Sequence, residues 1–194
     1  YRQLLQVRPE DSDGLNGLAT VLAARGDTAR ALETILQSLQ IKETASAKRI
    51  FVDIVKQIRW AADNREARRA MARALTEPWA RPDELAHTSA SLIKQSAPIG
   101  VCVARAAQAW PHSLSASELF GPDGPKMPAD DGLLLALLVS AQNTDVELER
   151  FLTMARRLLL EAAEGDGADD AGLAFYAALA RQCFINEYVF FHSE

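Results

Sequence analysis

The residues whose types could support catalysis or metal binding are few and lie far apart in the chain. His87, His112 and His192 have no partner at the short spacings that zinc sites use. The glycine cluster at 165–167 joins two expected helices and carries an acid, whereas a nucleotide-binding loop follows a strand. Neither a phosphate-binding loop ending in Gly-Lys-Ser/Thr nor a Gly-x-Ser-x-Gly turn occurs. We therefore expect no catalytic, cofactor-binding or metal-binding residue in this chain.

The two cysteines, Cys102 and Cys183, show no metal-ligand spacing. We expect both to be buried, reduced thiols in a cytoplasmic protein rather than partners in a disulfide. A nucleophilic Cys183 would need a base and an electropositive setting. Its neighbours in the sequence are mostly apolar, which favours a packing role.

Polar residues interrupt the apolar segment near the end of the chain. Arg181, Asn186, Glu187 and Tyr188 lie among leucine, phenylalanine, isoleucine and valine side chains. If these polar groups are buried they must be hydrogen-bonded, which would fix a specific helix contact. We expect them to form a polar network or a contact with another domain. The alternatives are a face open to solvent and a pocket in which Asn186, Glu187 and Tyr188 reach a substrate.

The elements that would position these residues are helices. Alanine and leucine dominate the composition and alternating apolar strands are scarce, so the sequence predicts an all-α fold. At 194 residues the chain is long enough for one domain, or two small ones, with a substantial core. Residues 12–42 show two short amphipathic patterns on either side of Gly26-Asp27, and Asp27 suits the N-cap of the second helix.

This helix pair resembles a tetratricopeptide repeat, a helical hairpin with a period of 34 residues. The matching positions are Leu15, Leu18, Ala19, Leu22, Gly26, Asp27, Ala31 and Leu39. The segment from Tyr1 to Pro9 fits the second helix of a preceding repeat, which gives one and a half repeats over residues 1–43 and predicts a domain boundary at the start. The family binds partners on its concave face. The resemblance implies that Asp13, Asn16, Thr20 and Ala24 line that face.

We expect helical segments to continue the stack over residues 44–110. The apolar spacing predicts one helix over 44–62, and Asn64 is placed to cap the next helix. Pro82 suits the first turn of a third helix, because a proline there loses no hydrogen bond. Residues 99–110 are predicted to be helical, with a strand at 99–103 as the alternative.

Residues 111–131 are rich in proline and glycine and predict a mobile loop with one short turn, capped by a Ser115/Glu118 capping box. After this loop, residues 132–194 are expected to form an apolar helical subdomain. Thr144 and Glu147 suggest a second capping box there. The last helix is predicted over 171–191 and is apolar on nearly every side, so other chain segments must cover it.

The charges divide the chain into two unlike halves. Residues 1–81 hold 14 Lys/Arg and 10 Asp/Glu, whereas residues 82–194 hold 7 and 16. Acids interrupt the basic residues of the first half and no stacking aromatics lie among them, so we expect no nucleic-acid partner. The longest apolar run, residues 133–139, is far below the ~20 residues that cross a bilayer, so we expect no membrane span.

Three further segments suggest a family. Residues 180–190, 77–85 and 148–153 are similar to the helical middle region of bacterial proteins that join tetratricopeptide repeats to an S-adenosylmethionine-dependent methyltransferase domain. The resemblance implies that S-adenosylmethionine binds in a C-terminal domain beyond residue 194 and not in this chain. The chain would then be a non-catalytic module that binds a protein or peptide and positions its own C-terminal domain. The alternatives are a helical region that contributes residues to a substrate pocket, and a scaffold that forms a homo-oligomer.

Overall fold

Helices form all of the regular secondary structure within residues 1–77, 79–163 and 172–186, the part that the computed structural model describes. The helices are α1 (Arg2–Val7), α2 (Ser12–Ala24), α3 (Thr28–Ile41), α4 (Ala45–Val55), α5 (Arg65–Thr76), α6 (Pro82–Gln95), α7 (Ala97–Ala109), α8 (Ala116–Phe120), α9 (Lys126–Ala129), α10 (Gly132–Ser140), α11 (Val146–Ala163) and α12 (Leu173–Ile185). The predicted all-α fold class is confirmed. None of the described helices is both long enough and apolar enough to span a bilayer.

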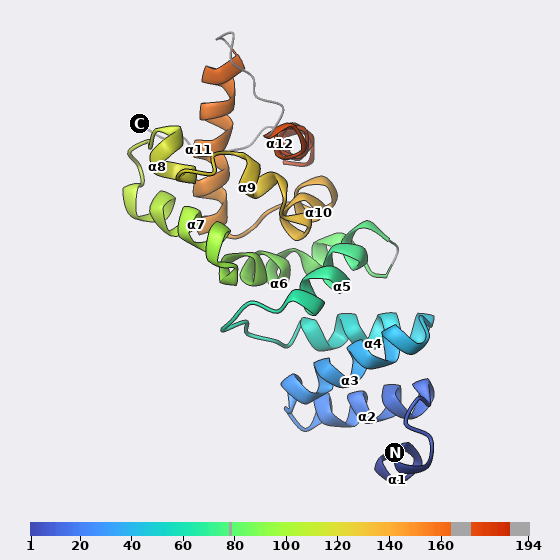
Figure 1. The fold of residues 1–194 in the computed structure, drawn as a ribbon. Coiled ribbons are helices and arrows are strands. Elements are labelled where there is room, and N and C mark those ends of the chain that lie inside the picture. The colour runs from blue at the N-terminus through green and yellow to red at the C-terminus, as the bar shows by residue number, and fades with distance from the viewer. Residues whose placement is uncertain (78, 164–171, 187–194) are drawn as a thin grey trace.

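The hairpin of α2 and α3 follows directly from its sequence. Asp11 caps α2 by accepting a bond of 2.7 Å from the Gly14 amide, and Asp27 is the N-cap of α3. Gly26 joins the helices with a φ of 79°, a conformation that glycine adopts without steric cost. α4 packs against α3, so α1 to α4 form a stack at the N-terminal end of an elongated molecule (Figure 1).

The helix predicted over 44–62 is shorter than expected, since α4 ends at Val55. Two tight turns follow, in which the Gln57 and Ile58 amides donate to the carbonyls three residues earlier. The Val55 carbonyl also accepts a bond of 2.9 Å from the Thr88 hydroxyl of α6. The Trp60 indole in turn donates to that hydroxyl over 3.0 Å. Contacts with α6 thus satisfy the end of α4, in place of another helical turn.

In the middle of the chain the helices begin at the predicted cap and proline. Asn64 caps α5 by accepting from the Ala67 amide at 2.9 Å, and Pro82 is the first residue of α6. A single residue, Ser96, separates α6 from α7. The strand alternative for 99–103 is wrong, because those residues lie within α7.

The segment at 111–131 contains more structure than a loop. The Ser115/Glu118 capping box forms as predicted and opens α8. A second short helix, α9, follows where proline and glycine had indicated irregular chain. Leu119, Phe120 and Pro128 are buried, so the segment packs on the bundle. Its predicted mobility stays a prediction.

The C-terminal bundle is built on α10, α11 and α12. The predicted Thr144/Glu147 capping box is wrong: Asp145 caps α11 by accepting from the Leu148 amide at 2.9 Å. Glu147 instead forms an ion pair of 2.7 Å with Lys94 of α6. Asp145 also pairs with Lys94 at 2.7 Å, so a tertiary contact supports this cap. Three rings form the centre of the bundle: Phe120, Phe151 and Phe175, with centroids 6.1–6.4 Å apart.

The two cysteines differ in burial. Cys102 is buried in α7, and desolvation raises the pKa of its thiol. Cys183 is only partly buried in α12, which corrects the expectation that both thiols lie in the core. Both are free thiols. The last helix, predicted over 171–191, ends at Ile185 with Asn186 as its C-cap, and residues 187–194 lie outside the described part of the chain.

Candidate functional site

A groove of about 400 Å³ lies between α2 and α4. Its apolar lining comes from Ala23 on α2 and from Ile50 and Ile54 on α4, while Arg49 and Asp53 are exposed beside these isoleucines. The remaining lining residues are Thr20, Ala24, Ser46 and Gln57. The groove exists because α3 packs against both helices and leaves the inner surfaces of α2 and α4 facing solvent.

The structure separates the four residues predicted to line a concave face. Thr20 and Ala24 lie in the groove and are exposed. Asp13 is exposed but lies outside the groove lining. Asn16 is buried, with only 5% of its surface accessible. Whether a partner contacts these residues stays a prediction.

Asn16 has a different position because it holds the hairpin together. Its side-chain oxygen accepts a bond of 2.8 Å from the Ser38 hydroxyl of α3, and Ser38 is fully buried. The Asn16 carbonyl accepts from the Thr20 hydroxyl at 2.9 Å, so Thr20 offers the groove only its acceptor capacity. The Asn16–Ser38 contact therefore sets the spacing of α2 and α3, while Thr20 lies at the solvent side.

The charged residues of the groove keep their ionic groups available. Arg49 and Asp53 are one turn apart on α4, and neither side chain forms an ion pair or hydrogen bond with the described residues. Gln57 donates to the Asp53 carbonyl over 2.9 Å, which leaves the carboxylate free of that contact. Sequence reasoning missed Arg49 and Asp53, because the alignment to one repeat did not show which helix would form the second wall.

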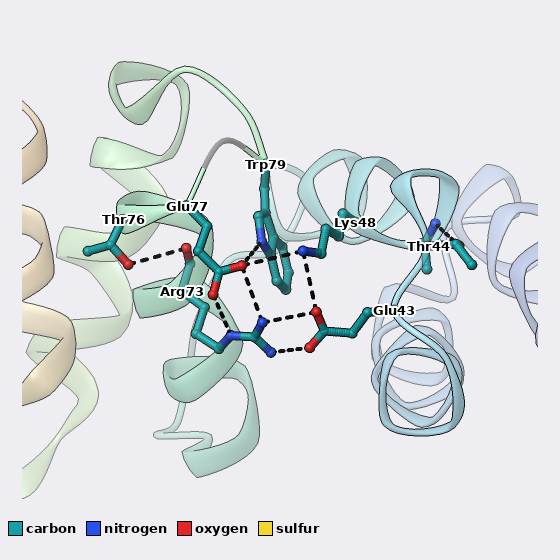
Figure 2. A network of polar contacts seen from close by, with 8 residues as sticks. Glu43, Thr44, Lys48, Arg73, Thr76, Glu77 and Trp79 are labelled. Carbon is teal, nitrogen blue, oxygen red and sulfur yellow. Dashed lines mark hydrogen bonds and ion pairs between the residues drawn. The ribbon is translucent and has the colours of Figure 1, made fainter.

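A network of charged residues surrounds Trp79 where α4 meets α5 (Figure 2). We call Glu43, Lys48, Arg73, Glu77 and Trp79 the Trp79 network. Arg73 forms hydrogen bonds with both carboxylates, and Lys48 pairs with both at 3.3 Å. The Lys48 ammonium and the Arg73 guanidinium lie 4.8 and 5.3 Å from the centroid of the Trp79 ring. The Trp79 indole donates to Glu77 over 2.6 Å.

The electrostatics of this network indicate a structural role. Hydrogen bonds from Arg73 and then Trp79 lower the pKa of Glu77 to about 2, and Arg73 also lowers the pKa of Glu43. Two acids and two bases balance each other, so no proton donor or acceptor is poised near neutral pH. The network instead fixes α4, and with it one wall of the groove, against α5.

A second polar network is buried between α11 and α12. We call Asn143, Glu149, Arg156 and Gln182 the Arg156 network. Arg156 pairs with Glu149 at 2.8 Å and also donates to the Gln182 side-chain oxygen. The Asn143 amide donates to the other Glu149 oxygen at 2.9 Å. The side chains of Glu149 and Arg156 are only 9% and 11% exposed, so the pair is largely withdrawn from water.

The four residues predicted to form a polar contact near the end of the chain have separate outcomes. Asn186 is buried one turn beyond Gln182, and its side-chain oxygen has no hydrogen-bond partner among the described residues. Arg181 is exposed and donates to the Val139 carbonyl of α10 at 3.0 Å. Glu187 and Tyr188 lie outside the described residues. The available signal for the Arg156 network was the pair of charged residues at positions 149 and 156, seven residues apart on one side of an amphipathic helix.

Within the described residues no three His, Cys, Asp or Glu side chains are grouped as a metal would require. His87 and His112 are exposed, and His192 and the glycines at 165–167 lie outside the described residues. The groove offers binding surface, and the two networks offer structural contacts. No protein-family model, curated protein or solved structure matches this chain, so the groove and both networks are interpreted from their own geometry.

Proposed function

We propose that the chain is a non-catalytic helical module that binds a protein or peptide segment in the groove between α2 and α4. The observation that carries the proposal is this groove of about 400 Å³, which combines an apolar lining with two charged side chains that have no described ionic partner. Small residues at Ala23 and Ala24 leave room for a ligand backbone to approach α2 closely.

The surrounding contacts support a preformed site. The buried Asn16–Ser38 bond fixes α2 on α3, and the Trp79 network fixes α4 on α5. A groove whose walls are held in this way loses little conformational entropy when a ligand binds. Binding then depends on the groove side chains and not on folding of the walls.

The proposal is tested by filling the groove. Ala24→Trp places a large side chain in it, and Ala104→Trp on the exposed side of α7 is the matched control. Peptides selected from a random displayed library on the wild-type chain are expected to bind Ala104→Trp equally and Ala24→Trp far more weakly. Equal binding to both variants, or no peptide enriched over an uncoated surface, would contradict the proposal. Circular dichroism checks that both variants keep their helical content.

The positioning of a methyltransferase domain, which the sequence resemblance implies, belongs to the same proposal. Its support is α12, where Leu173 and Phe184 are 61% and 69% exposed and lie on one face, eleven residues apart. A scaffold that associates through this face is the competing function, so light scattering separates the two: a concentration-dependent dimer that Phe184→Ser abolishes favours self-association. Calorimetry in which this chain alone binds S-adenosylmethionine would contradict the non-catalytic role.

A further inference from the structure

Arg49 and Asp53 place a positive and a negative charge along the groove between α2 and α4. They are four residues apart on α4, so their side chains project on one side at a spacing of about 6 Å. Charges in this arrangement often pair along a helix, but these two do not pair with each other or with other described side chains. Asp53 lies within electrostatic reach of Lys56, whose own partner is Glu84 at 2.7 Å. The groove thus presents one positive and one negative group to a ligand.

The dimensions of the groove favour an extended ligand. The α4 lining from Ser46 to Ile54 covers about 12 Å at 1.5 Å per residue, which corresponds to about four residues of extended chain. An extended chain places residues i and i+2 on one side, about 6.6 Å apart, which matches the spacing of Arg49 and Asp53.

The apolar lining of the groove indicates which side chain a ligand carries between its two charged residues. In an extended chain residue i+1 points opposite to its neighbours, so it faces the apolar lining, where Ile50 is partly exposed, when residues i and i+2 face the charged groups. An aliphatic side chain in that position buries apolar surface that Ile50 otherwise leaves accessible.

We propose that the groove selects extended peptide segments with the pattern acid–aliphatic–base, in which the acid pairs with Arg49 and the base with Asp53. This inference rests on the proposed function and names its ligand class. Either chain direction satisfies the three contacts, so the pattern can be written acid first or base first.

The test compares the capped pentapeptide acetyl-Ser-Glu-Leu-Lys-Ser-amide with acetyl-Ser-Glu-Leu-Glu-Ser-amide, in which an acid replaces the base, and the blocked ends carry no charge. Each is titrated into ¹⁵N-labelled protein, and amide chemical shifts report affinity and location. The mixed-charge peptide is expected to bind the wild-type chain about tenfold more tightly, because the all-acid peptide places a carboxylate against Asp53 in either chain direction. The variant Asp53→Arg is expected to prefer the all-acid peptide. It changes one exposed residue, so α4 should remain folded.

Equal affinity of the two peptides, or the same preferred peptide in the wild-type and Asp53→Arg proteins, would overturn the inference. Absence of shifts in α2 and α4 with both peptides would overturn it too. The proposed function fails separately, when library-selected peptides bind Ala24→Trp as well as they bind Ala104→Trp. Selected peptides that are sensitive to Ala24→Trp but insensitive to Asp53→Arg would leave the binding function standing without this ligand class.

Discussion

The Trp79 network and the Arg156 network use the same kinds of side chain in opposite surroundings. In the first, the charged side chains of Arg73, Glu43 and Glu77 remain 46%, 37% and 36% exposed. In the second, Glu149 and Arg156 are about one-tenth exposed. Water screens exposed pairs strongly, whereas a buried pair depends on its partners because each charge has lost its hydration. We therefore expect the Trp79 network to be adjustable and the Arg156 network to be essential to its region.

The apolar parts of the two regions differ in the same sense. Trp79 contacts Phe51 edge-to-face with centroids 5.8 Å apart, so one ring links the N-terminal stack to α5 and α6. In the C-terminal bundle, Phe120, Phe151 and Phe175 contact one another from α8, α11 and α12. A junction that depends on the single Trp79 ring can be weakened by substituting one residue. In the C-terminal bundle the aromatic packing is shared by three rings, so it does not depend on one residue alone.

The largest effect is expected for Arg156→Met. The substitution leaves the buried Glu149 carboxylate without its cation, and losing one member of a buried pair costs about 3–5 kcal/mol. Urea denaturation followed by circular dichroism measures the loss. The double variant Arg156→Met/Glu149→Leu removes the stranded charge and is expected to regain most of the stability. A double variant no more stable than Arg156→Met would show that the pair is not the cause.

Trp79→Ala is expected to have a somewhat smaller effect, about 3 kcal/mol, because it removes a buried ring that packs on Phe51. It also removes the surface that Lys48 and Arg73 cover. Hydrogen exchange should show the loss mainly in α4, with α11 keeping its protection. Equal loss in both helices would mean that the two regions unfold as one unit and that the contrast between them does not extend to stability.

These comparisons also show what sequence can predict. Caps such as Asp27, Asn64 and Ser115 act within three residues, so local pattern is sufficient to find them. The end of α4 depends on Thr88, which is 33 residues away, and the sequence prediction therefore extended the helix too far. The cap of α11 is Asp145, whose carboxylate also pairs with Lys94 of α6 at 2.7 Å, a contact that local pattern does not show.

The candidate sites show the same difference between local patterns and contacts that join distant residues. Thr20 and Ala24 were named from the resemblance to a tetratricopeptide repeat, and both lie in the groove lining. Arg49 and Asp53 belong to the facing helix, and one sequence gives no register between helices. The contacts of Arg73 with Glu43 and of Arg156 with Gln182 join residues 30 and 26 positions apart. Charge and periodicity show that such residues need partners, but only the packing of the helices selects them.

A change of salt concentration should separate the two regions without any mutation. The Debye length falls from about 10 Å at 0.1 M to about 3 Å at 1 M, which weakens exposed pairs far more than buried ones. Amides of α4 and the start of α5 should lose exchange protection in 1 M NaCl relative to amides of α11. Because all are measured in one sample, general effects of salt on apolar burial cancel in the ratio. Parallel changes in α4 and α11 would contradict the assignment of ionic stabilisation to the Trp79 network.

The smallest expected effect is the pH dependence that Glu77 contributes. Its pKa in the folded chain is about 2, below its ordinary value of 4.5, because Arg73 and Trp79 donate hydrogen bonds to the ionised form. A lowered pKa means that the folded state binds fewer protons, so the stabilisation is complete above about pH 4.5 and is lost as the pH falls toward 2. Glu77→Gln cannot titrate, and its stability should therefore decline less steeply than the wild-type over that interval. Glu161→Gln, which removes an exposed carboxylate paired with Arg157 in α11, is the matched control and should leave the difference between α4 and α11 unchanged. If Glu77→Gln and the wild-type chain show the same slope in acid, the network holds α4 through the packing of Trp79 alone, and its charges serve only to cover that ring.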